Sequence, residues 1–246
     1  MSKQGGLGAN FYAGGVDVSG DIGQVNNLST PLAVGVVTGI DKFAFERLAL
    51  KKDGALAGQT WWNTARVHTV LSLLPTADVM FAYYQGTAIG NDSFNMVAKQ
   101  LNYDPARAAD GMLTTSFSAQ ANGYGAEWGV QLTAGMRTDV AATNGASLDN
   151  TAGTAFGLQA YLHVFSVVGT SVTVTLQGSP DNNTFSAIAS PMAFSPVLGG
   201  ATGQQRIAVA NTTVIPRYVR AITTGTFSSA VFAVVLVKNA EAGVVF

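Results

Sequence analysis

The chain has 246 residues, of which 48% are hydrophobic and only 11% are charged, with no cysteine and a formal net charge of −1. The lack of cysteine excludes disulfides and thiolate metal sites, and a nearly neutral chain without a basic cluster argues against a general nucleic-acid binder. Soluble domains carry about 25% charged residues. A surface with so few charges is less costly to desolvate, which is typical of a protein that buries much of itself against neighbours.

The first thirty residues form a glycine-rich arm with short apolar pieces and no strong period. No apolar segment follows Met1–Gly6, so we expect no signal peptide. The longest strongly apolar run, residues 230–237, is far shorter than the ~20 residues that cross a bilayer, so we expect no membrane partner. The arm has too few apolar residues to fold alone, and we expect it to become ordered by docking on neighbouring subunits.

A hairpin is predicted next. Residues 32–50 are rich in Val, Ile and Phe, and residues 56–62 form the return strand. The turn between them is Lys51, Lys52, Asp53 and Gly54, because Asp-Gly between strand-like runs is a strong hairpin signal. Trp61 and Trp62 are adjacent and must point to opposite faces of a strand. A carbohydrate platform and a subunit contact are both open for the exposed one, and we favour the contact.

The segment 63–75 is predicted to be the one helix. Its stripe is Val67, Val70, Leu71 and Leu74, spaced i, i+3, i+4 and i+7. Asn63 or Thr64 provides the cap and Pro75 the end. A helix this short requires packing on a sheet.

Strands are then predicted at 78–85, 94–103 and 112–121, the last with alternating apolar and polar residues. Residues 141–154 are small and polar, and we expect a linker there. The charge changes at the same place: residues 156–246 hold 2 acids and 4 bases, which leaves 12 acids and 9 bases for residues 1–155. We therefore predict two domains, residues 1–152 and 153–246.

The C-terminal domain is predicted to be an all-β sandwich, with turn signals at sandwich-like spacing. Its expected strands are 157–168, 171–177, 184–189, 205–210, 217–223 and 229–238. Residues 231–237 are apolar on both faces, which favours a central strand.

No pattern in the sequence predicts catalysis. The two histidines are His68 and His163, and neither a Gly-x-Ser-x-Gly elbow nor a His-Glu-x-x-His motif is present. Asp104 and Asp110 flank one connector. Loop carboxylates can bind calcium, but we favour a role for both residues in forming the turn. We predict that the chain is not an enzyme and uses no cofactor and no metal.

Two stretches carry a resemblance. Residues 37–48 (VTGIDKFAFERL) are followed by Lys52-Asp53-Gly54, the helix, residues 97–103 (VAKQLNY) and residues 114–123 (TTSFSAQANG). This order resembles the major tail, or tail-tube, proteins of siphophages that infect actinobacteria. The second stretch runs from 172–177 (VTVTLQ) through 217–220 (RYVR) to 231–235 (VFAVV) and is similar to β-sandwich domains appended to phage tail proteins.

The resemblance implies a mainly-β fold, with a tail-tube-like sandwich or barrel, one short packed helix and a C-terminal sandwich on the outer surface. It also implies rings, usually hexamers, that stack into a hollow tube in the virion. Its partners would be copies of itself, a tape-measure protein and a tail terminator, and DNA would pass through as cargo. Closing strands across subunits would remove exposed edges. The net charge of −3 in residues 1–155 (9 − 12) departs from a strongly acidic lumen.

We predict that the contacts between subunits involve the hairpin and one exposed tryptophan. The candidate residues are Phe43, Phe45, Lys51, Lys52, Asp53, Gly54 and Trp61. Two alternatives stay open: a capsid decoration or minor tail protein, and an adhesin that binds glycans through the C-terminal sandwich.

Overall fold

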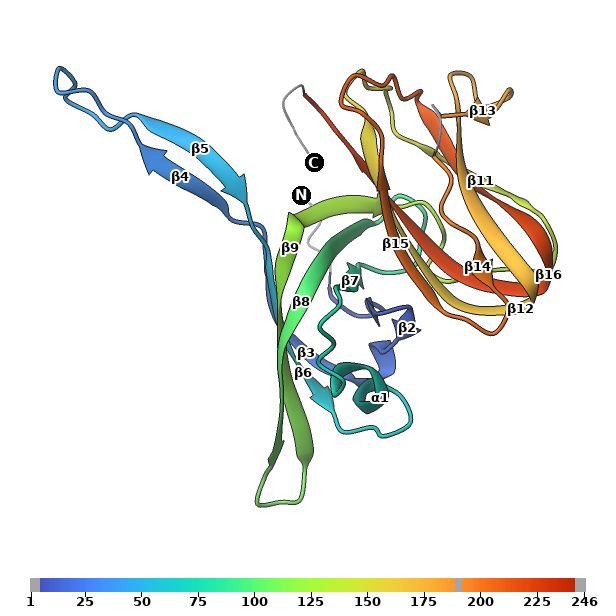
Figure 1. The fold of residues 1–246 in the computed structure, drawn as a ribbon, viewed down its shortest axis with the longest axis horizontal. Coiled ribbons are helices and arrows are strands. Elements are labelled where there is room, and N and C mark those ends of the chain that lie inside the picture. Colours follow the sequence, from blue (N-terminus) through green and yellow to red (C-terminus); the bar gives the residue numbers. More distant parts are fainter. Residues whose placement is uncertain (1–4, 189–191, 242–246) are drawn as a thin grey trace. The chain divides into compact units, whose positions relative to one another are not determined.

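The computed structural model describes residues 5–188 and 192–241. In these residues fourteen β-strands form one sheet, two strands form a second sheet, and one short α-helix and one 3₁₀ turn complete the fold (Figure 1). The prediction of a mainly-β chain is confirmed.

The elements of the first half are β1 (Asn10–Ala13), β2 (Val16–Asp17), η1 (Ser19–Asp21), β3 (Ile22–Ser29), β4 (Leu32–Val36), β5 (Arg47–Lys52), β6 (Ala55–Trp61), α1 (Val67–Leu71), β7 (Val79–Tyr84) and β8 (Asp92–Arg107). The second half contains β9 (Leu113–Gln131), β10 (Arg137–Asp139), β11 (Asn144–Asp149), β12 (Leu158–Ser179), β13 (Ser186–Ala187), β14 (Val197–Leu198), β15 (Gly203–Ala208) and β16 (Tyr218–Lys238).

The chain divides into two compact units. Unit 1 contains residues 1–20, 80–95 and 128–246, and unit 2 contains residues 21–79 and 96–127. The strands β8 and β9 each begin in one unit and continue into the other. Both sides of residue 152 lie in unit 1, so the compact units do not coincide with the expected boundary. The functional division into an assembling part, 1–152, and an appendage, 153–246, stays a prediction.

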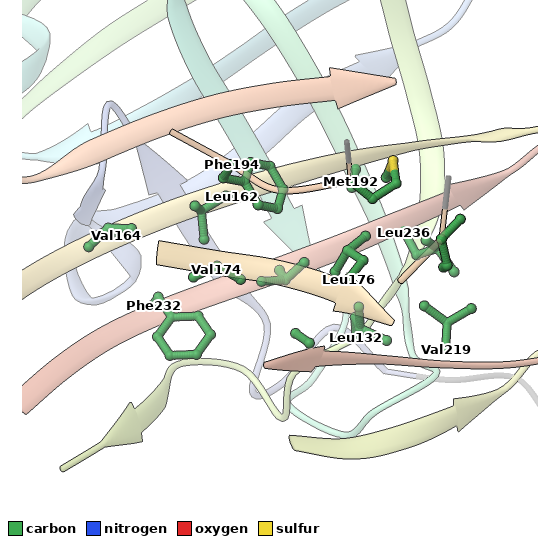
Figure 2. Packing of buried hydrophobic residues seen from close by; sticks show 14 of the residues in the cluster. Leu132, Leu162, Val164, Val174, Leu176, Met192, Phe194, Val219, Phe232 and Leu236 are labelled. Carbon is green, nitrogen blue, oxygen red and sulfur yellow. The ribbon is translucent and has the colours of Figure 1, made fainter. Parts of the chain in front are cut away.

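Two long strands organise unit 1. β12 and β16 pair antiparallel from Leu158 opposite Lys238 to Ser179 opposite Tyr218. Because side chains alternate along a strand, alternate residues toward both ends of each strand enter one buried apolar cluster (Figure 2). This cluster includes Leu158, Ala160, Leu162, Val164, Val172, Val174 and Leu176 of β12, and Val219, Phe232, Val234 and Leu236 of β16.

The breaks expected inside these two strands are absent, and this corrects the sequence analysis. The expected strands 157–168 and 171–177 fall, from residue 158 on, within the single strand β12. The expected strands 217–223 and 229–238 fall, from residue 218 on, within β16. Gly169 and Gly225 both have positive φ, at +136° and +121°. Gly169 lies at two shifts of register, and both glycines closely approach the backbone of the opposite strand, so each strand continues where a break was expected.

The expected linker contains a strand. β11 pairs with β16, with Leu148 opposite Val219 and Asp149 opposite Tyr218. Its residues are mostly small or polar, and only Leu148 is buried. The apolar alternation that marks most strands is therefore missing. Backbone hydrogen bonds to a strand about 70 residues later hold it, and no local pattern predicts such pairing.

The N-terminal arm docks on its own chain. This corrects the expectation that it becomes ordered only by docking on a neighbouring subunit. β1 pairs with β7 over four residues, from Asn10 opposite Tyr84 to Ala13 opposite Phe81. Phe11, Tyr12 and Ala13 are buried as a result. The arm's first four residues, Met1–Gln4, lie outside the described residues.

Unit 2 is built on antiparallel strands. β6 pairs with β3 on one side and with β9 on the other. In β9 the alternation predicted from the sequence is confirmed, because Thr115, Phe117 and Ala119 are buried while Ser116 and Gln120 are exposed.

The helix is present but short. α1 spans only Val67–Leu71, with both end residues buried. Leu74 has a φ of +41°, which is left-handed backbone, and its side chain is exposed. The predicted stripe therefore ends one turn early. Asn63 does not cap the helix; its side chain accepts a hydrogen bond from the Ala65 amide at 2.9 Å and donates one to Asp21 at 2.8 Å.

Candidate assembly surface

A two-stranded hairpin, β4–β5, is the most exposed part of unit 2. Its strands pair antiparallel, with Leu32 opposite Lys52 and Val36 opposite Arg47. They form a sheet of their own, separate from β3 and β6 (Figure 1). We call residues 32–52 the assembly hairpin. An isolated two-stranded hairpin is marginally stable in water, so a third surface would be expected to support it.

The assembly hairpin exposes a run of large apolar side chains. Residues 32–36 and 47–52 are exposed at almost every position among the residues that the structure describes, so the pleat turns alternate residues to solvent on both sides. Exposure rises from 48% for Leu32 to 110% for Phe43. The exposed residues are Leu32, Val34, Val36, Val37, Ile40, Phe43, Phe45, Leu48 and Leu50. A contiguous apolar surface of this kind marks an interaction site.

The tip of the hairpin is the segment between the two strands, residues 37–46. Thr38 accepts a hydrogen bond from the Glu46 amide at 2.9 Å through its Oγ1. Lys42 lies 3.7 Å from a carboxylate oxygen of Asp41 and 3.8 Å from one of Glu46. The charges of the tip therefore pair among themselves. Phe43 lies at this tip, fully exposed, and Phe45 is 70% exposed.

The structure corrects the predicted turn. Lys51 and Lys52 are the last residues of β5, and Asp53 and Gly54 connect β5 to β6 at the base of the hairpin. The Asp53 amide donates to the Pro31 carbonyl at 2.9 Å, and the Asp53 carboxylate accepts from Gln120 at 3.1 Å. The local Asp-Gly signal was misleading because β5 pairs with β4, whereas β6 pairs with β3 and β9.

Gly54 is needed for close packing at this base. A Cβ at this position would lie 2.4 Å from the Ala126 Cβ and 2.7 Å from the Ala126 nitrogen. We expect Gly54→Ala to lower the free energy of unfolding by roughly 1–3 kcal/mol, the usual cost of overpacking. Urea unfolding followed by circular dichroism measures it. Gly5→Ala is the matched control, because nothing lies within 4 Å of its Cβ position; equal stability of the two variants would contradict the prediction.

Trp61 lies at the far end of β6 from the hairpin. It is the last residue of the strand, six positions after Ala55, which places it roughly 20 Å away at ~3.3 Å per residue. Its indole packs over Gly23 of β3, where a Cβ would meet three ring atoms at 3.1–3.5 Å. The ring is 46% exposed. The structure thus does not bring Trp61 to the other candidate residues.

Trp62 points to the opposite face, as predicted. Its ring lies 4.3 Å from the ring of His68 in α1, centroid to centroid. The His68 Nδ1 is 3.2 Å from the Tyr103 hydroxyl. These rings hold the short helix against β6 and β8.

The sequence analysis missed a sheet edge. Among the described residues, β3 pairs with β6 alone, so its other side is open over eight residues. An open edge presents backbone groups that another strand can pair with. β3 precedes β4 directly, so edge and hairpin are consecutive. The segment IGQVNNLS has little apolar alternation, which left no strand signal in the sequence.

The polar groups can be compared with the ligand sets that metal ions need. No group of three or more His, Asp or Glu side chains could hold a metal ion there. Asp110 accepts a hydrogen bond from the Met112 amide at 3.0 Å in the turn between β8 and β9. Asp104 lies within β8 and accepts one from Asn102, so the two carboxylates do not flank one loop as expected. Within residues 5–188 and 192–241 no helix has the length and hydropathy to span a membrane.

Comparison with known proteins gives no family for this chain. No protein-family model matches it, and no curated protein matches it. Among solved structures, the chain is similar to the Dit protein (gp 19.1) of phage SPP1, described as a hub adsorption apparatus protein of phages that infect Gram-positive bacteria. The identity is 10%, with 93% of this chain and 98% of that chain covered and a TM-score of 0.33.

It is also similar to a chain of the phage p2 baseplate in its activated conformation with strontium, at 8% identity and a TM-score of 0.38, covering 94% of this chain and 98% of that chain. The corresponding calcium form gives 9% identity and a TM-score of 0.34 over 94% and 98% of the two chains. These values describe distant similarity only.

Proposed function

We propose that the chain is a non-enzymatic structural protein of a long-tailed phage, which assembles with copies of itself as stacked rings into the tail tube. The observation that carries this proposal is the assembly hairpin, whose nine large apolar side chains its own chain leaves exposed. Apolar burial contributes about 25 cal/mol per Å². A hairpin of this composition is therefore stabilised most when a neighbouring copy of the chain covers its apolar side chains.

The open edge of β3 supports the same proposal. Sheets that close across subunits leave no edge exposed to wrong partners. Edge and hairpin lie next to each other in the chain, so one subunit offers a backbone edge and an apolar ribbon from consecutive residues.

The charge of the chain suits a conduit. With 13 basic and 14 acidic residues, the protein has no basic excess with which to hold phosphates. DNA would then pass through the tube as cargo without being bound. A tape-measure protein and a tail terminator are the further partners that the tail-tube resemblance implies, and the virion is the implied location.

Electron microscopy of the purified protein in negative stain, with analytical ultracentrifugation of the same sample, tests the proposal. Tubes or stacked rings are the expected result. Discrete rings that never stack would support self-assembly but not a tube. The chain would then be assigned to a component at one end of the tail. Dispersed trimers would favour a capsid decoration protein. Monomers that bind glycans on an array would favour the adhesin, and either of the last two results would overturn the proposal.

A further inference from the structure

The N-terminal residues 10–18, which we call the flap, close over one side of unit 1. The flap contains β1 and β2, which pair with each other over two residues. Four of its own side chains are buried: Phe11, Tyr12, Ala13 and Val18. Outside these two strands, its sheet partner is β7, over four residues.

Beneath the flap lies a buried histidine. His163 is on β12 between Leu162 and Val164, which point into the apolar cluster, so its ring points to the opposite side. The ring centroid is 5.9 Å from that of Tyr12 in the flap and 6.3 Å from that of Phe165, with which it stacks. The ring is completely buried, and in the described structure neither of its nitrogens has a hydrogen-bond partner.

This environment disfavours the charged imidazolium. Burial lowers the pKa of His163 from 6.5 to about 3. The titratable groups around it are the phenols of Tyr12 in β1 and Tyr84 in β7, whose own pKa values are raised by burial. Asp17 in the flap acts on Tyr12, and Arg206 of β15 donates a hydrogen bond to Tyr161, two residues before His163. Among the described residues no carboxylate forms an ion pair with His163.

The flap is held by fewer backbone pairs than β12, the strand that carries His163. β12 is paired with β16 over twenty positions and with β15 over six more. The flap is held to β7 by four paired residues and by a hydrogen bond from the Gly14 amide to the Met80 carbonyl at 3.0 Å. Local opening follows the segments with the fewest bonds to break, so water reaches His163 by displacement of Tyr12 before β12 separates from its neighbours.

We propose that the flap is an acid-released element, in which protonation of His163 detaches residues 10–18 while the paired strands β12 and β16 stay folded. This inference concerns a change within one subunit and goes beyond the proposed assembly function. The test of the flap and the test of assembly can therefore succeed or fail independently of each other.

The direction of the effect follows from proton binding. The closed state takes up a proton only near pH 3, whereas the open state takes it up near the ordinary value of 6.5. The closed flap is therefore fully favoured above pH 6.5 and loses stability as the pH falls from there toward 3. Well below pH 6.5 each pH unit shifts the open-to-closed ratio by about tenfold. At pH 6.5 the open state is already half protonated, so the shift from pH 6.5 to 4.5 is about fiftyfold.

Hydrogen–deuterium exchange of the full chain at pH 7.5, 6.5, 5.5 and 4.5, corrected for intrinsic exchange, measures this ratio for each segment. We expect protection of residues 10–18 to fall about fiftyfold between pH 6.5 and 4.5, while protection of residues 230–236 in β16 stays constant. His163→Phe, which keeps an aromatic ring and cannot titrate, should make the flap independent of pH. His68→Gln is the matched control, since His68 is the chain's other histidine, and it should behave as the wild type.

The wild-type measurement alone can overturn the proposal, whether or not the variant folds. Constant protection of residues 10–18 from pH 7.5 to 4.5 would do so, as would loss of protection in residues 230–236 at the same pH. An unchanged pH dependence in a folded His163→Phe protein would assign the effect to other groups.

Discussion

Replacing both Phe43 and Phe45 with serine should abolish assembly and leave the fold of the subunit intact. The two side chains are 110% and 70% exposed, so the subunit by itself loses little packing beyond the Arg47 guanidinium, which lies 5.4 Å from the Phe45 ring centroid. In an assembled state each buried phenylalanine contributes roughly 1.5–3 kcal/mol. Loss of both should weaken each contact by roughly 3–6 kcal/mol, about 10²–10⁴ in the association constant. Sedimentation velocity and electron microscopy should then show monomers.

Two controls separate this effect from general changes of the surface. Leu198→Ser with Val214→Ser removes comparable exposed apolar area from unit 1 and should leave assembly unchanged. Lys51→Ala with Lys52→Ala, at the base of the hairpin, should weaken assembly mildly and in a salt-dependent way, because exposed ion pairs contribute only ~0–1 kcal/mol. Tubes that persist in the double phenylalanine variant would refute the role of the hairpin.

Phe232→Ala should destabilise unit 1 by roughly 3–5 kcal/mol, the usual cost of removing a buried aromatic ring. Phe232 is completely buried in the apolar cluster to which β12 and β16 both contribute (Figure 2). The Arg137 guanidinium lies 5.3 Å from its ring centroid. Alanine would leave a cavity that these long paired strands cannot close. Urea unfolding followed by circular dichroism measures the loss.

The same substitution at an exposed site is the matched control. Phe43→Ala should change the free energy of unfolding by less than about 0.5 kcal/mol, because its ring has no contacts to lose within the subunit. If Phe232→Ala were as stable as Phe43→Ala, the apolar cluster would not be the source of unit 1's stability.

Local pattern was informative wherever one strand face is buried. The alternation in residues 113–119 predicted which side chains of β9 point inward, and the doubly apolar run 231–237 predicted a central strand, which β16 is because it pairs on both sides. The stripe at Val67 and Leu71 also located α1. In these segments the spacing of apolar residues along the chain directly predicts which side chains are buried.

The candidate surface was only partly predictable. The sequence indicated an apolar hairpin with Phe43 and Phe45 exposed, and both residues are exposed. It placed the tip at Lys51–Gly54, because Asp-Gly is a strong local turn signal. The actual tip is residues 37–46, since β5 takes β4 as its partner and the Asp53 amide donates to Pro31. Competition between possible partner strands is not visible in a local turn motif.

By itself the sequence determined the mainly-β class, the position of the helix and the apolar character of residues 32–50, because these depend on side-chain periodicity and composition. The tertiary structure alone decided the pairing of β11 with β16, the docking of the N-terminal flap and the complete burial of His163. Each of these joins residues about 70 or more positions apart. The hydrogen bonds and covered surfaces that stabilise them come from strands whose partner choice no local stretch of sequence contains.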